Sequence, residues 1–217
     1  MEPVIIIGIF VAFFGLVIFG IVMSIRAERK RTEALSALAG SLGFEFNAEG
    51  FAQGAATFGH LEFFNRGHSR RSKNMLSVNK DGNMVRLFDY RYTTGSGKNQ
   101  STHVSSVCTV EIQRELPGIT ARPEHFFDKI AAAIGWDDID FEESPEFSKK
   151  FCVKSADKEF ARKFFNKPMM DLLLRTGNVY LEAGGKALLI HFGKKLKVED
   201  FPKLCATALE FVAAMPQ

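Results

Sequence analysis

The first 31 residues constrain this chain more than any other part of the sequence. Residues 4–25 carry no charged side chain and only one hydroxyl group, that of Ser24. A helix needs about 20 apolar residues to cross the hydrocarbon core of a bilayer, and this run of 22 residues meets that requirement. The sequence therefore predicts a transmembrane anchor over residues 1–25, a juxtamembrane helix over residues 26–43, and a domain over residues 44–217.

Two other interpretations of the apolar run fit less well. A cleaved signal peptide begins with basic residues and has an apolar core of roughly 7–15 residues, whereas this chain begins Met1-Glu2-Pro3 and its apolar run is longer. A buried helix of a soluble protein usually keeps a polar face, which residues 4–25 lack. An uncleaved anchor is the favoured interpretation.

The flanking charges predict which way the anchor points. No basic residue precedes the apolar run, and four follow it: Arg26, Arg29, Lys30 and Arg31. Because Lys and Arg next to a span stay on the cytoplasmic side, the N-terminus should face outward and residues 26–217 should lie in the cytoplasm. The cysteines are odd in number and widely spaced, as expected of core residues in a reducing compartment: Cys108, Cys152 and Cys205.

Small residues in the anchor leave open whether it pairs with a second copy. Gly8 with Ala12, and Gly20 with Ser24, stand four positions apart, a spacing that lets two membrane helices approach closely. Such steps also arise by chance in spans that contain glycine. A homo-oligomer formed through the anchor is therefore an alternative to a single tether in the lipid bilayer.

Hydrophobic periodicity after the anchor predicts an α+β fold, with an antiparallel sheet and helices packed on one side of it. A helix face and its glycine stop are visible at Leu35, Leu38, Ala39, Leu42 and Gly43. Strands are expected at residues 44–46, 61–64, 75–78, 84–92 and 103–112. The Asp81-Gly82 step predicts a tight hairpin turn between the third and fourth of these strands.

The C-terminal half alternates between helices and extended segments. Pro123 should open a helix over residues 123–134, and Ser155 should cap a helix over residues 157–165. A second hairpin is expected over residues 179–192, with its turn at Gly184-Gly185. Further helices are expected from Pro168 onward and over residues 201–212.

Basic residues gather in one segment that the pattern places in a loop: Arg66, His68, Arg70, Arg71 and Lys73. This segment is the candidate contact for anionic lipid or for a protein partner, and a solvated connection between strands is the alternative. Nucleic acid is not expected as a partner, because the net charge is only +3 and no recognition motif accompanies the basic residues.

The sequence predicts no catalytic residue, no cofactor and no metal site. Gly95-Ser96-Gly97-Lys98 lacks the first glycine, the hydroxyl residue and the helix of a phosphate-binding loop. The carboxylates within residues 137–146 lack the spacing of a calcium loop and favour a solvated edge. Asp89 and Arg91 fall on one strand face and predict a cross-strand ion pair. Convergence of these two with His103 would instead indicate an enzyme.

Residues 86–215 carry a series of short motifs. They read LFDY at residues 87–90, FEESPEFS at 141–148, FCV at 151–153, AR at 161–162 and NKPMM at 166–170. This series resembles an uncharacterised family of bacterial membrane-anchored proteins, known as a domain of unknown function. The resemblance implies a bacterial origin and a setting at the cytoplasmic (inner) membrane, and it supplies no catalytic residues.

Together these observations predict a single-pass inner-membrane protein whose cytoplasmic domain is a binding or interaction module. Two alternatives stay open. One is an enzyme of unknown reaction that acts at the membrane surface. The other is a peripheral sensor of anionic lipid that uses residues 66–73.

Overall fold

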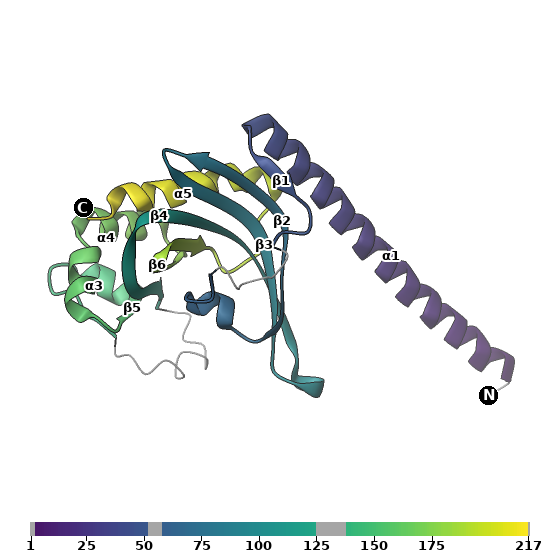
Figure 1. Cartoon of the computed structure of the whole chain (residues 1–217). Helices are drawn as coiled ribbons and strands as arrows, with labels where there is room; N and C mark the ends of the chain where they lie inside the picture. Colours follow the sequence, from purple (N-terminus) through teal and green to yellow (C-terminus); the bar gives the residue numbers. More distant parts are fainter. Residues whose placement is uncertain (1–2, 52–57, 125–137, 217) are drawn as a thin grey trace.

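The computed structural model describes residues 3–51, 58–124 and 138–216 of the chain (Figure 1). One helix, α1 (Pro3–Leu42), runs from the N-terminus into the domain without a break. Its 40 residues make it about 60 Å long, roughly twice the thickness of a hydrocarbon core. The stretch Phe10–Leu42 contains a segment long and apolar enough to span a membrane, and none of that segment is buried in the domain. The predicted anchor and juxtamembrane helix are therefore one helix.

The end of α1 follows from the glycine that the sequence places there. Gly43 has a φ of +72°, a left-handed conformation that glycine adopts without steric penalty. The N–H of Gly43 donates to the carbonyl of Gly40, and the N–H of Phe44 donates to that of Ala39 over 2.9 Å. These two bonds satisfy the last carbonyls of the helix, so the prediction of a stop at Gly43 is confirmed.

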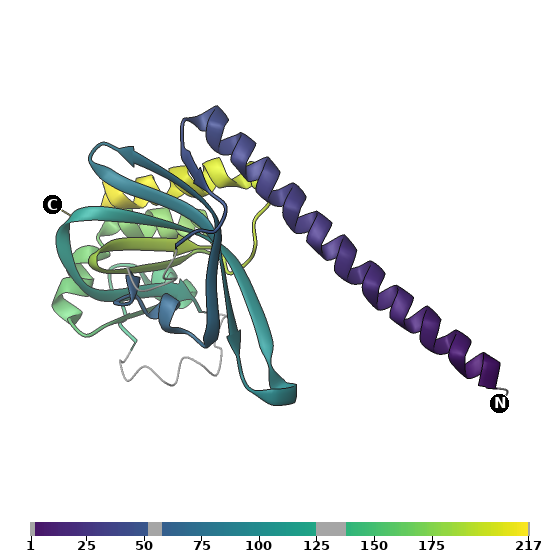
Figure 2. The ribbon, with the colours of Figure 1, turned by 45° about the vertical axis from the view of Figure 1, so that its right-hand side comes forward.

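A six-stranded antiparallel sheet follows, with β4 at its centre. The first four strands run along the order β1-β2-β3-β4, and β4 is long enough to pair with β3, β5 and β6. Figures 1 and 2 show that the sheet is strongly curved. The strands are β1 (Glu45–Asn47), β2 (His68–Lys80), β3 (Asn83–Thr94), β4 (Ser101–Pro123), β5 (Phe151–Ser155) and β6 (Tyr180–His191).

The two faces of the sheet bury different side chains. Leu87 and Val85 of β3 join the larger core with Leu35 of α1 and with α5. Phe88 and Tyr90, which alternate with them, join a smaller aromatic core under the 3-10 helix η2 (Glu62–Asn65). The α+β class is thus confirmed. The other helices are α2 (Pro145–Lys150), α3 (Lys158–Phe164), α4 (Lys167–Thr176), α5 (Phe201–Ala214), η3 (Gly97–Asn99) and η5 (Val198–Asp200).

The first predicted hairpin is confirmed. Lys80 of β2 pairs with Asn83 of β3, and the two residues between them are Asp81 at φ +53° and Gly82 at φ +79°. Positive φ at both central positions is the geometry of a type I′ turn, whose twist matches that of paired strands. The turn fixes the register that carries the polar residues described below.

The second predicted hairpin is wrong. Residues 180–191 form one strand, β6, which pairs with β4 over most of its length. Gly184 and Gly185 lie at a shift in register, where β4 has more residues than β6 between the pairs Glu111–Ala187 and Leu116–Gly185. Paired glycines are compatible with a bulge as well as with a turn, and here β4 bends around them.

Several element boundaries also differ from the prediction. Residues 62–65 form η2 instead of a strand, and the N–H groups of Glu62 and Phe63 are bound by the carboxylate of Glu182. Asp157 caps α3 by accepting the N–H of Phe160, whereas Ser155 lies in β5. The helix α2 was not predicted. Pro123 ends β4, and most of the helix expected after it lies outside the described residues.

We expect Gly67→Ala to lower the unfolding temperature of the full-length protein more than Gly97→Ala does. Both glycines have a φ of +56°, so alanine carries a similar conformational penalty of about 1 kcal/mol at each. A Cβ at Gly67 would lie 2.1 Å from the carbonyl oxygen of Thr93, whereas one at Gly97 meets no atom within 4 Å. Circular dichroism in detergent measures the difference, and equal shifts would contradict the close packing of Gly67 on β3.

Candidate functional site

One face of α1 docks on the domain. Leu35 and Ala39 are fully buried in the larger core, and Glu28, Arg31 and Thr32 continue the same face toward the N-terminus with polar contacts. The spacing of these five residues follows the 3.6-residue period of a helix. The contact therefore changes from apolar to polar along α1 in the direction of the predicted membrane span.

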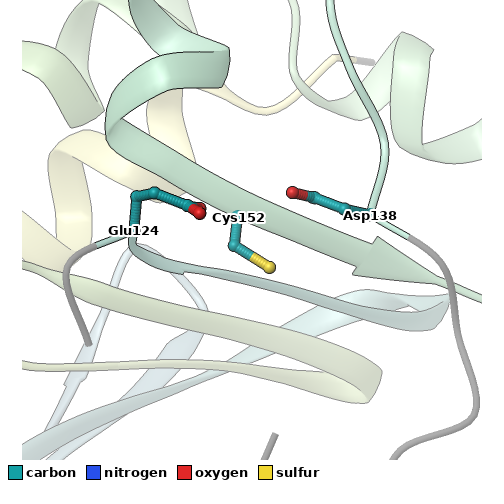
Figure 3. A group of neighbouring side chains, drawn as sticks. All are labelled: Glu124, Asp138 and Cys152. Carbon is teal, nitrogen blue, oxygen red and sulfur yellow. The ribbon is translucent and has the colours of Figure 1, made fainter. Parts of the chain in front are cut away.

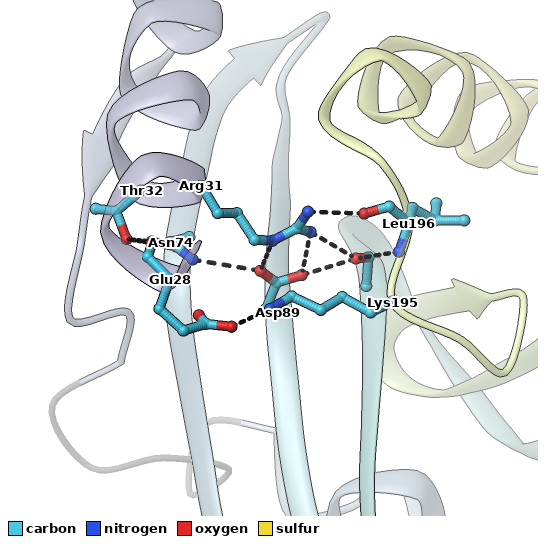
Figure 4. A network of polar contacts seen from close by, with 8 residues as sticks. Glu28, Arg31, Thr32, Asn74, Asp89, Lys195 and Leu196 are labelled. Atoms are coloured by element: carbon cyan, nitrogen blue, oxygen red, sulfur yellow. Dashed lines mark hydrogen bonds and ion pairs between the residues drawn. The ribbon is translucent and has the colours of Figure 1, made fainter. Parts of the chain in front are cut away.

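The polar part of this contact centres on a buried ion pair (Figure 4). Arg31 binds Asp89 of β3 with two parallel bonds, Nε to Oδ2 at 2.7 Å and Nη2 to Oδ1 at 2.8 Å. Only 12% of the arginine side chain and 7% of the aspartate side chain are exposed. Arg31 Nη1 also donates to the carbonyl of Leu196 at 2.8 Å, and the guanidinium lies 5.5 Å from the ring centre of Phe201.

Further hydrogen bonds surround the ion pair and involve three other segments (Figure 4). Ser106 of β4 donates to Asp89 over 2.7 Å and accepts the N–H of Leu196 over 3.0 Å. Asn74 of β2 donates to Asp89 over 3.3 Å and accepts the hydroxyl of Thr32 over 2.8 Å. A buried ion pair is stable only when such bonds satisfy its remaining polar atoms. We call Arg31, Thr32, Asn74, Asp89 and Ser106 the junction network.

The backbone of β2 is bent to place Asn74 in the junction network. Asn74 has a φ of +55° and lies at a shift in register between Lys73 and Leu76. Its own N–H leaves the β2–β3 ladder and donates to the carbonyl of Ala48 over 2.9 Å. Asparagine tolerates this left-handed conformation better than most residues, and its amide is the bridge between α1 and Asp89.

The ion pair joins two residues that the sequence did not predict to be in contact. Asp89 was expected to pair with a residue on a neighbouring strand, yet its ion-pair partner is Arg31 of α1. Arg31, predicted to flank the anchor, keeps that place in the sequence, and its side chain is largely buried against the domain. Its position four residues before Leu35 places it on the apolar face of the helix, which is the signal that distinguishes it from exposed Arg26, Arg29 and Lys30.

The predicted basic segment is not a loop over most of its length, because β2 begins at His68. Two of its arginines have structural roles. Arg66 is an ion-pair partner of Glu62 at 3.3 Å, and Arg70 donates to the carbonyls of Asn65, Arg66 and Gly67. Both therefore hold the connection between η2 and β2. His68 lies at the exposed start of β2, where its Nε2 is 3.1 Å from the carbonyl oxygen of Gly95.

The other two basic residues of the segment, Arg71 and Lys73, are exposed on the face of the sheet that carries Asp89. Arg71 pairs directly with Arg91 of β3 in the register. His103 is opposite Tyr92 and stacks on it at 4.9 Å, so it lies on the other face of the sheet from Asp89 and Arg91. The convergence of these three residues that an enzyme would need does not occur.

A second buried polar cluster lies beneath η2. Glu182 of β6 accepts the N–H groups of Glu62 and Phe63, the latter over 3.0 Å. Burial raises the pKa of the Glu182 carboxyl to about 7, and the two backbone N–H groups oppose that rise. The neighbouring His191 accepts the N–H of Gly193 at Nδ1 and is stacked on Tyr180 at 4.5 Å. Burial holds the pKa of His191 well below its usual range, so the ring is neutral.

One group of side chains in the described part of the chain has a composition that could bind a cation: Glu124, Asp138 and Cys152 (Figure 3). Asp138 Oδ1 already accepts the N–H groups of Ile139 and Val153. Arg122 brings a positive charge 3.8 Å from the Cys152 sulfur, and burial raises the pKa of that thiol. A guanidinium beside the ligand and a protonated thiol both oppose cation binding, and the contact shown is that of Asp138 with the backbone of Val153 in β5.

The glycine-rich segment and the acidic stretch singled out in the sequence both lie at the surface where the structure describes them. Residues 95–98 form an exposed turn that enters η3 at the tip of the β3–β4 hairpin, and this is not the strand–loop–helix arrangement of a phosphate-binding loop. Of the acidic stretch, Asp140 and Glu142 are exposed. An apolar groove of about 410 Å³ lies between the end of α1 and α5. Its lining includes the apolar residues Phe44, Leu87 and Leu209 and one basic residue, Lys80.

The fold is shared with a protein of known structure. No family model matches the chain, and no curated protein matches it significantly. Among solved structures, the chain is similar to the mycobacterial trehalose monomycolate transport factor A, TtfA, with a TM-score of 0.64 over 87% of this chain and 97% of TtfA. The two sequences are 12% identical. The likeness therefore establishes a common α+β architecture.

We expect Arg31→Ala to destabilise the full-length protein strongly, because it leaves Asp89 buried without its ionic partner. Removing one member of a buried pair lowers the free energy of unfolding by about 3–5 kcal/mol. Arg29→Ala is the matched control, since Arg29 is 81% exposed and forms an ion pair with Glu33 in the same helix, an interaction worth about 0.5 kcal/mol. Denaturant unfolding in detergent compares them, and equal effects would contradict a structural role for the ion pair.

We expect the stability difference between the wild type and Glu182→Gln to depend on pH. Because the pKa of Glu182 is raised in the folded state, the folded state binds this proton more tightly than the unfolded state does. The stabilisation that protonated Glu182 gives the folded state is therefore full below about pH 4.5. It is lost as the pH rises toward 7, which lowers the free energy of unfolding by up to about 3 kcal/mol. His191 is present in both proteins and cancels in the difference. A pH-independent difference would show that the Glu182 pKa is not raised.

Proposed function

We propose that this chain is a single-pass protein of the bacterial cytoplasmic membrane with residues 26–217 in the cytoplasm, and that its domain, residues 44–217, is an interaction module held in a fixed orientation at the membrane surface. The junction network carries this proposal, because it joins the membrane-spanning helix to three strands of the domain through a buried ion pair. A flexible tether would leave the domain free to rotate, whereas this junction sets which of its surfaces face the bilayer.

Two further observations support an interaction module. The TtfA structure, which has the same fold, belongs to a protein named a transport factor, and such a role is consistent with binding partners at a membrane. An enzyme at this sheet would need three polar side chains to converge, and they lie on two different faces: Asp89 and Arg91 on one, and His103 on the other. The basic residues after the apolar run support the cytoplasmic placement of the domain.

The orientation is tested by labelling intact cells with a membrane-impermeant maleimide. We expect a cysteine placed at Ser96 to react only after the cells are opened, and a cysteine placed at Glu2 to react before. The three native cysteines are buried and should contribute little background. Labelling of Ser96→Cys in intact cells would reverse the proposed topology.

The interaction is tested by crosslinking in intact cells, extraction of the full-length protein in mild detergent, and identification of what co-purifies. We expect a defined partner that is lost when the β3–β4 connection, residues 93–101, is replaced by a short turn. It should be retained when exposed residues of α3, such as Lys163, are substituted. Recovery of the protein alone from cells would count against an interaction module.

A further inference from the structure

The β3–β4 hairpin extends from the domain on the side where α1 leaves it. In Figures 1 and 2 the hairpin tip and the N-terminal half of α1 point away from the core in the same general direction. The tip holds residues 95–100, all of them exposed. If the N-terminal half of α1 crosses the bilayer, the ends of β2, β3 and β4 nearest this tip face the membrane surface.

This part of the sheet carries only basic ionisable side chains at its surface. Residues 66–80 and 90–110 contain no aspartate or glutamate. The exposed basic residues here include Arg71, Lys73, Arg91 and Lys98. We call these four the basic strand surface. On α1, the exposed residues Arg26 and Lys30 add charge of the same sign next to the predicted span.

The register of the strands places two of these charges against each other. Arg71 and Arg91 are directly opposite on β2 and β3 and share one face of the sheet. Like charges at such positions destabilise a sheet. Asp89, a neighbouring residue of β3 on the same face, already forms its ion pair with Arg31. Within the described residues no carboxylate pairs with Arg71 or Arg91, so the fold itself does not neutralise this repulsion.

We propose that the basic strand surface binds the headgroups of anionic phospholipids in the leaflet from which α1 emerges. This inference rests on the proposed function, since it requires the domain to sit against the membrane that α1 spans. The cytoplasmic leaflet carries a negative surface potential that attracts basic residues close to it. The junction network holds the basic strand surface on the membrane side, so lipid binding requires little further ordering of the domain.

Not all the basic residues near this surface take part. Arg66 and Arg70 use their guanidinium groups on Glu62 and on the carbonyls of residues 65–67, so they position the start of β2. The lipid contact therefore depends on Arg71, Lys73 and Arg91 of the strands and on Lys98 of the hairpin tip. A general effect of positive charge in residues 66–73 would instead involve Arg66 and Arg70 as well.

The test uses the full-length protein with a fluorophore on Ser96→Cys, reconstituted in vesicles that contain a headgroup-region quencher. The vesicles are made from phosphatidylcholine alone or from phosphatidylcholine with phosphatidylglycerol. We expect stronger quenching in the anionic vesicles, and weaker quenching in high salt because the charges are exposed. Arg71→Glu with Arg91→Glu should lower the ratio of docked to undocked hairpin by roughly tenfold or more.

A matched control keeps the same change in net charge. Lys149→Glu with Lys163→Glu alters exposed residues of α2 and α3, which lie far from α1 (Figure 1), and should leave the quenching unchanged. Lys98→Glu, a single change at the exposed tip, should weaken the quenching without affecting a strand. Thermal unfolding of each variant shows whether the fold is kept.

Quenching that is equal in neutral and anionic vesicles would overturn the lipid proposal. So would an equal loss of quenching in the α2 and α3 control. If a crosslinked protein partner is lost in Arg71→Glu with Arg91→Glu while the vesicles show no lipid dependence, the surface binds an acidic protein instead, and the proposed function stands. Labelling of Ser96→Cys from outside intact cells would defeat the proposed topology without altering the vesicle result.

Discussion

The bidentate contact between Arg31 and Asp89 is the interaction on which the arrangement of this molecule depends. It joins a helix that begins at residue 3 to a strand in the middle of the sheet, and Ser106, Asn74 and Leu196 complete its hydrogen bonds. Two charges removed from water are stabilised only when such partners surround them. The apolar contact of Leu35 and Ala39 fixes the other end of the docked segment. The helix and the domain are therefore joined by buried contacts of both kinds, polar and apolar.

The strand β2 departs from regular geometry where it meets α1. Ser69 and Asn74 both have positive φ, and both lie at shifts in the β2–β3 register. Non-glycine residues in this conformation are uncommon and are often found at functional positions. At Asn74 the reason is visible, since the bulge turns its amide toward α1 and Asp89. The same irregular strand presents Arg71 and Lys73 to solvent between the two bulges.

Much of the fold could be predicted because its signals are local. The apolar run of α1, the Asp81-Gly82 turn and the periodic face of α5 each depend on neighbouring residues, and all three are present. The junction network could not be predicted, because Arg31 and Asp89 are 58 positions apart and either charge alone fits an exposed site. The 3-10 helix η2 was missed for a similar reason, since its N–H groups are bound by the distant Glu182. Gly184-Gly185 was compatible with a turn or a bulge, and only pairing with β4 decides between them.

The unbroken course of α1 has a mechanical consequence. Glycine is present within it, yet no proline or kink lies between the apolar run and the docked face. Transmembrane helices tilt when the thickness of the surrounding bilayer changes. Because buried contacts join α1 to the sheet, such a tilt of α1 in the proposed membrane setting would rotate the whole domain relative to the membrane plane. In the proposed membrane setting, a force applied to the domain by a bound molecule would likewise tilt the span, and the helix would act as a lever between the lipid and the domain.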